Sequence, residues 1–527
     1  MRFVLPALLL FGLSPNVLAQ LSNSSKENAY YQIKEVPIPD DIVLEVGGLA
    51  FNDKDQLGVC TRRGELWVID KPASSKPSYT RYAHGLHEPL GLNWKDGSFY
   101  LAQRGELSRL TDTNGNGKAN KFESIYSWPL VGNYHEYSYG PLFRPNGNML
   151  VALNLGWIGR GASQSKWRGW IIEVTPDGDV TPIATGMRSP AGFGFNKDGE
   201  LFYTENQGDW VGSGRITHVE KGDFVGNPEG LRWADQPGSP VSLRIDDIDD
   251  SKGLTLYEYS KEKEGIKPPS VWFPHTLMGI STSSVAVLPE SWPFSGQMLI
   301  GDQGHSKLMR VYQEKINGVY QGICFPFREG FESGVLRTVW GKDNSLYVGM
   351  TSRGWASTGK EMFGLQRLVW NGKTPFEMET VKAKPDGFEI AFTERVNKKI
   401  AEDPASYSIT DFTFKYHHFY GSPPINKEKK NIVKATLDED GKTVRLYFDG
   451  FRPGYVYEIK AEGVRNDRGQ ELLHNFGYYT LNEIPAGEKM AMDHSDHNNA
   501  SGKAIDLISA KRPTKMPGED ASMAADP

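Results

Sequence analysis

One segment of the chain has the residue types and spacing of a calcium-binding loop. Asp112, Asn114, Asn116 and Glu123 fall at the first, third, fifth and twelfth positions of the pattern D-x-[DN]-x-[DN]-G-x5-E, and Gly117 allows the sharp turn at the sixth. Because oxygens at these positions can surround one ion, the spacing predicts a structural Ca²⁺ site, weakened by its two asparagines. The alternative is an Asn/Gly-rich hairpin that binds no metal.

Five further segments place unusual polar side chains next to predicted strands. They are residues 85–91, 133–137, 186–192, 204–210 and 301–307. Together they contain histidines, an arginine, a lysine, carboxylates and amides. Such groups supply acid–base chemistry and ligand contacts only if the fold gathers them in one place.

A repeated unit predicts how these segments could meet. The unit is a small residue, an apolar triplet, a turn with Asp or Asn before Gly, a strand, a second turn and another strand. It begins six times, near residues 48, 91, 140, 192, 284 and 338, with a long polar insertion at 232–269. Six such units predict an all-β chain whose residues 30–375 form a six-bladed β-propeller, since a closed ring of twisted sheets leaves only short edges. Propeller ligands bind at one mouth of the central channel, where loops converge.

The pattern changes after residue 384. Segments 388–392, 444–448 and 455–459 alternate apolar and polar residues, as half-buried strands do. We expect a small immunoglobulin-like β-sandwich over residues 384–484 that acts as a spacer or docking module. Residues 485–527 are poor in aromatics and predict a disordered tail, whose histidines and methionines could bind copper or nickel weakly.

The two ends and the composition narrow the classes of function. Arg2, the apolar stretch to Leu13 and the small-residue site ending at Ala19 are typical of a signal peptide (residues 1–19), too short for a transmembrane segment. We therefore expect export to the periplasm or the extracellular space. A net charge of −6 over 527 residues argues against a nucleic-acid partner. Cys60 and Cys324 are the only cysteines and there is no CxxCH, so no covalent haem is expected.

The order of the loop motifs resembles the glucose/sorbosone dehydrogenase family over about residues 40–370. The motifs are GLHEPLG at 85–91, the loop histidine at 135, GMRSPAG at 186–192 and ENQGD at 205–209. The resemblance implies a soluble propeller enzyme that uses pyrroloquinoline quinone (PQQ) and Ca²⁺ to oxidise a sugar or a related polyol or aldehyde. Electrons would then pass to a separate acceptor, because the chain has no haem motif of its own.

The same resemblance assigns roles to individual residues. His135 would be the general base, and Arg188 would stabilise negative charge on the cofactor. The backbone carbonyls of Gly208 and Asp209 would hold the catalytic Ca²⁺. The remaining cofactor contacts would come from Glu88, Gln207, His305, Lys307 and Arg337. The sequence departs from the family where its turn reads Arg-Ser instead of Arg-Asn, and where the basic residues of the last two blades follow another register.

Two other classes of function stay open. A calcium-dependent hydrolase or lyase acting on a sugar derivative or lactone would use His135 with a paired carboxylate, for which Glu88 and Glu136 are candidates. A non-catalytic propeller would bind carbohydrate or protein and would tolerate the loss of His135. In that case His135 is a structural residue packed between its neighbouring tyrosines.

Overall fold

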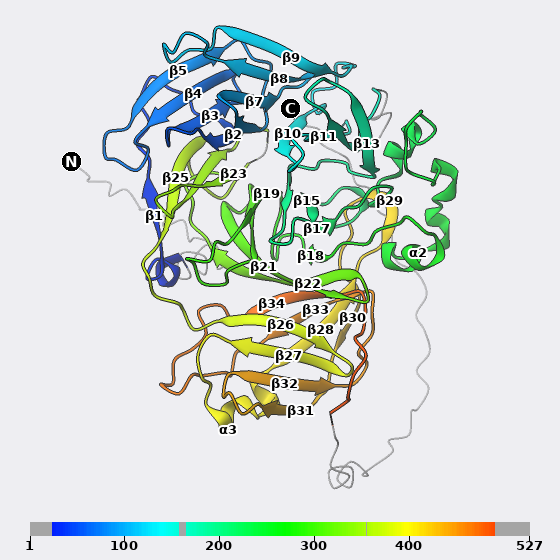
Figure 1. Cartoon of the computed structure of the whole chain (residues 1–527). Helices are drawn as coiled ribbons and strands as arrows, with labels where there is room; N and C mark the ends of the chain where they lie inside the picture. Colours follow the sequence, from blue (N-terminus) through cyan, green and yellow to red (C-terminus); the bar gives the residue numbers. More distant parts are fainter. Residues whose placement is uncertain (1–23, 157–164, 355, 491–527) are drawn as a thin grey trace, which may run out of the picture. The chain divides into compact units, whose positions relative to one another are not determined.

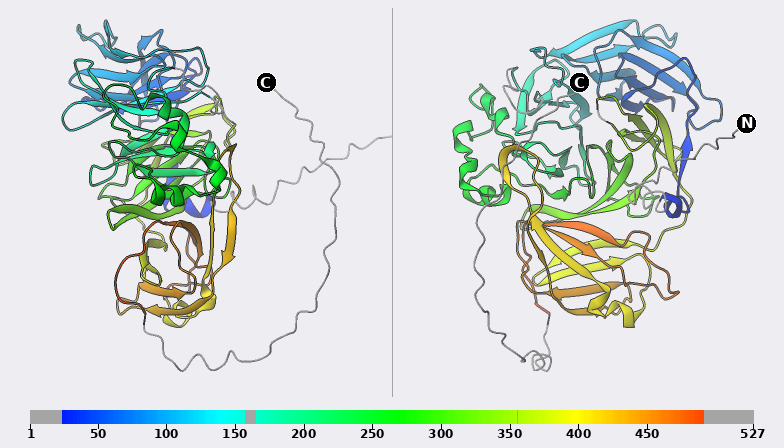
Figure 2. Two further views of the ribbon diagram at one scale, coloured as in Figure 1. Left: turned by 90° about the vertical axis from the view of Figure 1, so that its right-hand side faces the viewer. Right: turned by 180° about the vertical axis from the view of Figure 1, so that it is seen from behind.

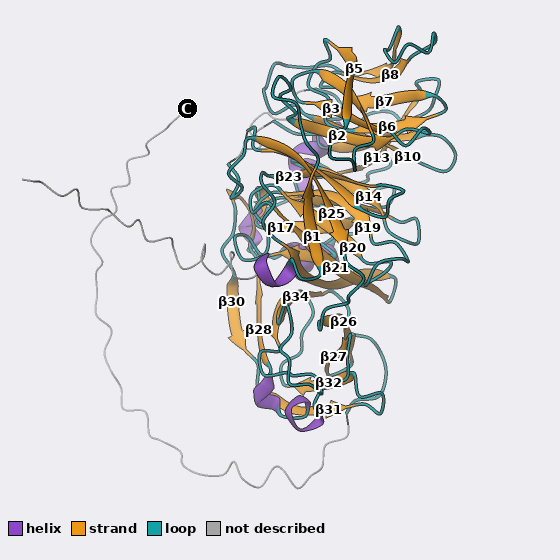
Figure 3. Cartoon of the chain, turned by 90° about the vertical axis from the view of Figure 1, so that its left-hand side faces the viewer, coloured by secondary structure: helices purple, strands orange, loops and turns teal. Residues whose placement is uncertain are grey.

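The computed structural model describes residues 24–156, 165–354 and 356–490 (Figure 1). The predicted signal peptide and most of the predicted tail lie outside these residues. The described chain is built of strands, with few short helices such as α2 (Leu256–Glu262) and α3 (Lys398–Ala401), as Figure 3 shows. Within the described residues, no helix is long and apolar enough to cross a membrane.

Five four-stranded antiparallel sheets and the first four strands of an eight-stranded antiparallel sheet form the main body, and these six sets are called the first to sixth sheets. The first three are β2 (Val46–Phe51), β3 (Leu57–Thr61), β4 (Glu65–Asp70) and β5 (Ser78–His84); β6 (Leu92–Lys95), β7 (Ser98–Ala102), β8 (Glu106–Thr111) and β9 (Lys121–Ser127); and β10 (Ser138–Phe143), β11 (Met149–Leu153), β12 (Trp170–Val174) and β13 (Val180–Thr185). The other three are β14 (Gly192–Phe195), β15 (Leu201–Glu205), β17 (Gly214–His218) and β18 (Val271–Phe273); β19 (Thr282–Val287), β20 (Met298–Asp302), β21 (Lys307–Ile316) and β22 (Val319–Arg328); and β23 (Val335–Trp340), β24 (Leu346–Thr351), β25 (Phe363–Trp370) and β1 (Tyr31–Glu35).

The first strands of the six sheets, β2, β6, β10, β14, β19 and β23, contact one another in a closed ring. This arrangement is consistent with the predicted propeller. The repeated turn chemistry explains the regularity: Asp96 and Gly97, between β6 and β7, both have positive φ, as a tight two-residue hairpin turn requires. Glycine also lets neighbouring first strands approach closely, since a Cβ on Gly192 would lie 2.0 Å from the Ser283 carbonyl oxygen.

The N-terminal strand closes the ring. β1 is the outer strand of the sixth sheet and pairs with β25, so that Tyr31 lies opposite Trp370. Tyr31 is buried against Phe327 and Trp292. The sixth sheet is thus assembled from both ends of the sequence that forms the ring, which fixes those two ends to each other.

The C-terminal strands form two packed sheets. One sheet contains β26 (Met378–Lys384), β27 (Gly387–Phe392), β32 (Thr443–Phe448) and β31 (Ile432–Leu437), and the other contains β34 (Phe476–Leu481), β33 (Tyr455–Lys460), β28 (Ser408–Thr413) and β30 (Ile425–Lys429). Their core includes Phe388 and Phe448 from the first sheet, Tyr457 and Tyr479 from the second, and Phe325 of β22. Because β34 pairs with β22, the second sheet continues the fifth sheet of the ring rather than forming a separate module.

One part of the sandwich crosses onto the ring. Residues 414–424, here called the sandwich arm, connect β28 to β30 and contain β29 (Tyr416–Tyr420). β29 pairs with β16 (Asp209–Val211), a short strand that comes between β15 and β17 in the sequence but is not part of the fourth sheet. Figure 2 shows the arm, in yellow to orange, reaching from the sandwich over the fourth sheet. The arm brings C-terminal residues to loops that the sequence analysis singled out.

Candidate functional site

A cavity of about 90 Å³ lies at the mouth of the ring, where the first strands begin. It brings together His135 and Arg188, two of the residues predicted from sequence, and Ser189 next to the latter. Arg62, Arg353 and Tyr420 also line the cavity and were not predicted. Three guanidinium groups around one imidazole make this a cationic site suited to a negatively charged ligand.

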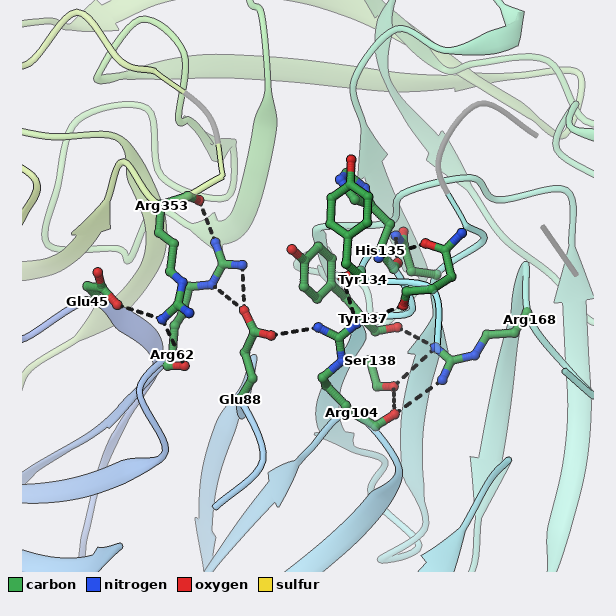
Figure 4. Close-up of polar contacts among 12 residues, drawn as sticks. Glu45, Arg62, Glu88, Arg104, Tyr134, His135, Tyr137, Ser138, Arg168 and Arg353 are labelled. Carbon is green, nitrogen blue, oxygen red and sulfur yellow. Dashed lines mark hydrogen bonds and ion pairs between the residues drawn. The ribbon is translucent and has the colours of Figure 1, made fainter. Parts of the chain in front are cut away.

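The loop that carries His135 is held by hydrogen bonds to its backbone (Figure 4). Arg104 donates to the carbonyl oxygens of Asn133 at 2.9 Å and Tyr134 at 2.6 Å. The amide of Asn154 donates to the His135 carbonyl oxygen at 2.6 Å. The imidazole ring lies between aromatic rings, with centroids 4.2 Å from Tyr134 and 5.5 Å from Tyr137. The ring is therefore positioned by neighbours on two sides while it faces the cavity.

Glu88 links two of the arginines, as Figure 4 shows. Its carboxylate lies 2.7 Å from Arg62 and 2.8 Å from Arg104. Arg62 also donates to the Arg353 carbonyl oxygen at 2.6 Å, and Arg353 pairs with Glu45 at 2.9 Å. Glu88 was predicted as a cofactor contact. In the structure its carboxylate forms ion pairs with Arg62 and Arg104 and so fixes the positions of these two side chains.

Arg188 is 5% exposed and packs tightly on the 204–210 loop. It donates to the Gln207 carbonyl oxygen at 2.8 Å, and its guanidinium lies 5.4 Å from the centroid of the Tyr420 ring. Among the described residues, no carboxylate lies within 4.0 Å of Arg188 in an ion pair, unlike Arg62 and Arg353. Its charge is therefore available to a ligand.

These charges keep His135 neutral. Burial lowers the pKa of His135, and the positive charges of Arg188, Arg104 and Arg62 lower it further, to about 4. A neutral imidazole can accept a proton from a ligand hydroxyl at neutral pH. A negative charge bound among the arginines would raise this pKa again and so make His135 a stronger base in the complex.

Residue 208 must be glycine because the Arg188 side chain packs directly against its backbone. A Cβ at residue 208 would lie 2.2 Å from Nε of Arg188 and 2.9 Å from its Cδ. Gly208→Ala should therefore push the guanidinium away and raise the pKa of His135 from about 4 towards its usual range. NMR titration of the imidazole measures this shift. Gly105→Ala, where a Cβ would meet nothing closer than 3.4 Å, is the matched control, and an unchanged titration in Gly208→Ala would contradict the packing argument.

The backbone carbonyls proposed for the catalytic Ca²⁺ do not fit that role in this structure. The Gly208 carbonyl oxygen accepts a hydrogen bond from the Gly421 N–H at 3.0 Å. Asp209 lies opposite Tyr420 in the pairing of β16 with β29, and its carbonyl oxygen accepts from the Asn227 amide at 3.5 Å. Both carbonyl oxygens therefore already accept hydrogen bonds from the protein, whereas a Ca²⁺ ion would need them as ligands.

The loop at 112–123 also differs from its prediction. Asp112 accepts hydrogen bonds from the N–H groups of Gly115 at 2.8 Å and Gly117 at 2.7 Å, as a turn residue does. Glu123 lies in β9 opposite Arg109 of β8 and binds it through both oxygens, at 2.9 and 2.7 Å. Both oxygens of Glu123 therefore bind an arginine of the protein, so this geometry does not support the predicted twelfth ligand. In the part of the chain that the structure describes, no three His, Cys, Asp or Glu side chains are grouped to hold a metal ion.

The other predicted residues lie away from the cavity. Lys307 is buried and faces Glu329 at 3.7 Å, while His305 lies beside Asp302. The Gln207 side chain contacts His275 at 2.9 Å. Arg337 lines the channel below the cavity, where it donates to the carbonyl oxygens of Ala191 at 2.7 Å and Leu90 at 2.9 Å. These four side chains therefore have protein partners at places other than the proposed cofactor site.

The alternative carboxylate Glu136 is also engaged. It is buried and accepts hydrogen bonds from the Ser165 hydroxyl at 3.0 Å and the Val131 N–H at 2.9 Å. Together with the ion-paired Glu88, this leaves neither candidate as a free carboxylate beside His135. The geometry therefore gives no support to the paired-carboxylate hydrolase.

Sequence reasoning missed the arginines of the mouth, although a signal was present. Arginine precedes glycine in the turn after the second strand of three repeats, at Arg63-Gly64, Arg104-Gly105 and Arg353-Gly354, and Arg62 lies one residue before the first. These turns lie at the mouth because they connect the second and third strands of their sheets. Tyr420 had no such signal, since it comes from outside the repeats.

Comparisons with known proteins give only distant similarities. No protein-family model matches the sequence, and no curated protein matches it. Similar solved structures include a glucose dehydrogenase-type oxidoreductase from Thermus thermophilus (16% identity, TM-score 0.48, covering 64% of this chain and 100% of that one) and the PQQ-bound aldose sugar dehydrogenase from Streptomyces coelicolor (15%, 0.48, 64% and 98%). The PQQ domain of a pyranose dehydrogenase from Coprinopsis cinerea is a third (12%, 0.43, 64% and 95%). At these identities and TM-scores, function has to be inferred from the site itself.

Proposed function

We propose that this protein is an exported oxidoreductase of the glucose/sorbosone dehydrogenase type, with the six sheets as propeller blades. It oxidises a sugar or a related polyol or aldehyde at the mouth, with PQQ as its cofactor, and electrons leave to a separate acceptor. The observation that supports this most directly is the cavity shared by His135 and Arg188, whose other charged lining residues are Arg62 and Arg353. A neutral base among fixed cations suits proton removal next to a negatively charged ligand.

The positive charge of the residues at the mouth is complementary to an acidic cofactor. A carboxylate of PQQ would be held by Arg188, which has no carboxylate in an ion pair among the described residues, while Arg62 and Arg353, already paired with Glu88 and Glu45, would add positive charge around it. When bound, the quinone supplies the acceptor for the hydride of the substrate C–H bond. The space is tighter: about 90 Å³ is below the roughly 300–1,000 Å³ of most small-molecule sites, and Tyr420 forms part of the wall. No step is assigned to Ca²⁺, because the Gly208 carbonyl oxygen is occupied by the arm.

The protein's own residues then act as follows. His135 takes the proton of the substrate hydroxyl as the C–H hydrogen leaves with its electron pair and a carbonyl forms. Arg188 offsets negative charge that develops beside it. Arg104 and Asn154 are positioning residues, because they bind the backbone of the loop that carries His135.

The test is a titration of the purified protein with PQQ, with and without Ca²⁺. Quinone absorbance reports binding, and dye reduction across a panel of sugars, polyols and aldehydes reports turnover. We expect binding to wild type and a dissociation constant at least tenfold larger for Arg188→Ala, because a hydrogen bond to a charged group is worth about 1.5–3 kcal/mol. Lys76→Ala, at an exposed lysine on a distant turn, is the control. If wild type binds no quinone, the dehydrogenase is excluded and a sugar-binding role for the mouth takes its place.

A further inference from the structure

We infer that Tyr420, supplied by the sandwich arm, is a specificity-determining residue that controls which ligands reach Arg188. The site would then be composite, made by the ring and the sandwich together. The identity of the ligand rests on the proposed function, but the control of access does not. From sequence, the sandwich was expected to be a spacer or docking module.

The backbone of the arm is fixed to the ring. The Gly421 and Ser422 N–H groups both donate at 3.0 Å, to the carbonyl oxygens of Gly208 and Gly212. Gly212 has no room for a side chain, since a Cβ there would lie 2.3 Å from the Cβ of Ser422. These contacts hold residue 420 at one place over the 204–210 loop.

The base of the arm is anchored as well. Tyr416 is buried, and its hydroxyl donates to the Gly226 carbonyl oxygen at 2.7 Å. Its ring packs on Trp210 at 5.4 Å and on Tyr259 at 5.5 Å. Two residues further along β29, His418 lies 2.5 Å from Asp250 of the insertion. The arm is therefore a built part of the mouth and not a loop that happens to lie near it.

At the end of this fixed strand, the Tyr420 ring packs over the Arg188 guanidinium, with 5.4 Å between the guanidinium carbon and the ring centroid. Tyr420 is 38% exposed, whereas Arg188 beneath it is 5% exposed. Both line the cavity with His135. An exposed side chain rotates on the picosecond to nanosecond scale while its backbone stays hydrogen-bonded. A ligand larger than the cavity can thus reach Arg188 only when the Tyr420 ring turns aside.

Tyr420 therefore selects ligands by their size. With the ring in place, the cavity of about 90 Å³ has space for a small acidic or hydroxylated fragment. A polycyclic acid or the ring of a sugar must displace or stack on Tyr420 to bring its charged group to Arg188. The phenol ring offers an apolar face to such a ligand, and the guanidinium offers charge.

The inference can be tested by the reactivity of Arg188 towards phenylglyoxal, an arginine reagent with an aromatic ring of its own. Peptide mass spectrometry after timed exposure gives the rate at each arginine. We expect Arg188 to react at least tenfold faster in Tyr420→Ala than in wild type. The rate at Arg81, whose side chain is 53% exposed and does not line the cavity, serves as the reference within each sample.

Phe419→Ala is the matched control, because Phe419 is the neighbouring aromatic residue, is 65% exposed and does not line the cavity. It should leave the Arg188 rate unchanged, and Tyr420→Phe should keep the protection because it keeps the ring. Tyr420→Val, which retains strand propensity, repeats the experiment if alanine weakens β29. Equal Arg188 rates in wild type, Tyr420→Ala and Tyr420→Val would overturn the inference.

Titration of the same variants with PQQ separates this inference from the proposed function. If no variant binds the quinone but Arg188 becomes reactive without Tyr420, the cofactor proposal fails and the role of Tyr420 stands. If all variants bind the quinone alike and Arg188 stays protected, the cofactor proposal stands and the role of Tyr420 is wrong. With both correct, PQQ should associate faster with Tyr420→Ala than with Phe419→Ala.

Discussion

Replacement of His135 by glutamine should lower turnover about 10²–10⁴-fold, the range that a lost general base usually costs. Glutamine is similar in size and polarity but cannot take the proton from a hydroxyl. Since the loop is held through its backbone by Arg104 and Asn154, the fold and quinone binding should be retained. Dye-coupled steady-state kinetics measures the turnover number, and absorbance titration measures the binding.

The pH profile tests the same assignment independently. A base must be unprotonated, so kcat/KM should be level at neutral pH and fall in acid. The fall should begin above pH 4, because the bound acidic cofactor raises the pKa of His135 from about 4. Arg188 lowers this pKa, so Arg188→Leu should move the acid limb of the profile to higher pH. His87→Gln, at an exposed histidine of the neighbouring loop, is the control for both measurements. Full turnover in His135→Gln would remove the residue from the mechanism.

Local sequence patterns predicted the repeated sheets but not the strands that join distant parts of the chain. A turn such as Asp96-Gly97 is encoded by two neighbouring residues, and Asn146-Gly147 and Asp198-Gly199 occupy the corresponding turns of the next two sheets. The pairing of β1 with β25, and of β34 with β22, depends on partners far along the sequence. An alternating strand pattern shows which face is buried and does not identify the neighbouring strand. The fusion of the sandwich with the fifth sheet was for this reason not predicted.

The same limit applies to the site. His135 and Arg188 were recognised because their loops carry a motif, and the cavity contains both. Glu123 was selected by its position in the calcium-loop pattern and Lys307 by the family resemblance, but the structure pairs them with Arg109 and Glu329, which use their charge. The side chain of Tyr420 reaches the mouth only because the arm leaves one domain and pairs with another. Residue type gives the chemistry that a side chain can do, and its partners decide whether that chemistry is available.

The second large effect concerns stability and depends on a buried triad at the junction of the ring and the sandwich. His474 lies 2.9 Å from Glu27 and 2.6 Å from Glu377, and all three side chains are at most 4% exposed. Glu27, from the N-terminal segment, also faces Arg328 of β22 at 3.3 Å. Removal of one member leaves buried charge without its partner, so His474→Gln should lower the free energy of unfolding by about 3–5 kcal/mol.

The triad also predicts how stability depends on pH. Burial alone would lower the pKa of His474, but the charge of Glu377 and hydrogen bonds with Glu27 and Glu377 raise it to about 10. A histidine with a raised folded-state pKa stabilises fully below its unfolded value of about 6.5, and this contribution is lost as the pH rises towards 10. Wild type should therefore lose stability between pH 7 and pH 10, and His474→Gln should lose much less over that interval.

Denaturant unfolding followed by tryptophan fluorescence at pH 7 and pH 10 measures both effects. His84→Gln, at an exposed histidine of β5, is the matched control and should behave as wild type does. Burial raises the pKa of Glu27, but the hydrogen bond and charge of His474 outweigh this and hold the pKa below its usual range. Glu27→Gln should accordingly destabilise the protein at pH 7 and also flatten the alkaline loss. An unfolding midpoint in His474→Gln equal to that of wild type at both pH values would show that the triad does not hold the N-terminal segment, the ring and the sandwich together.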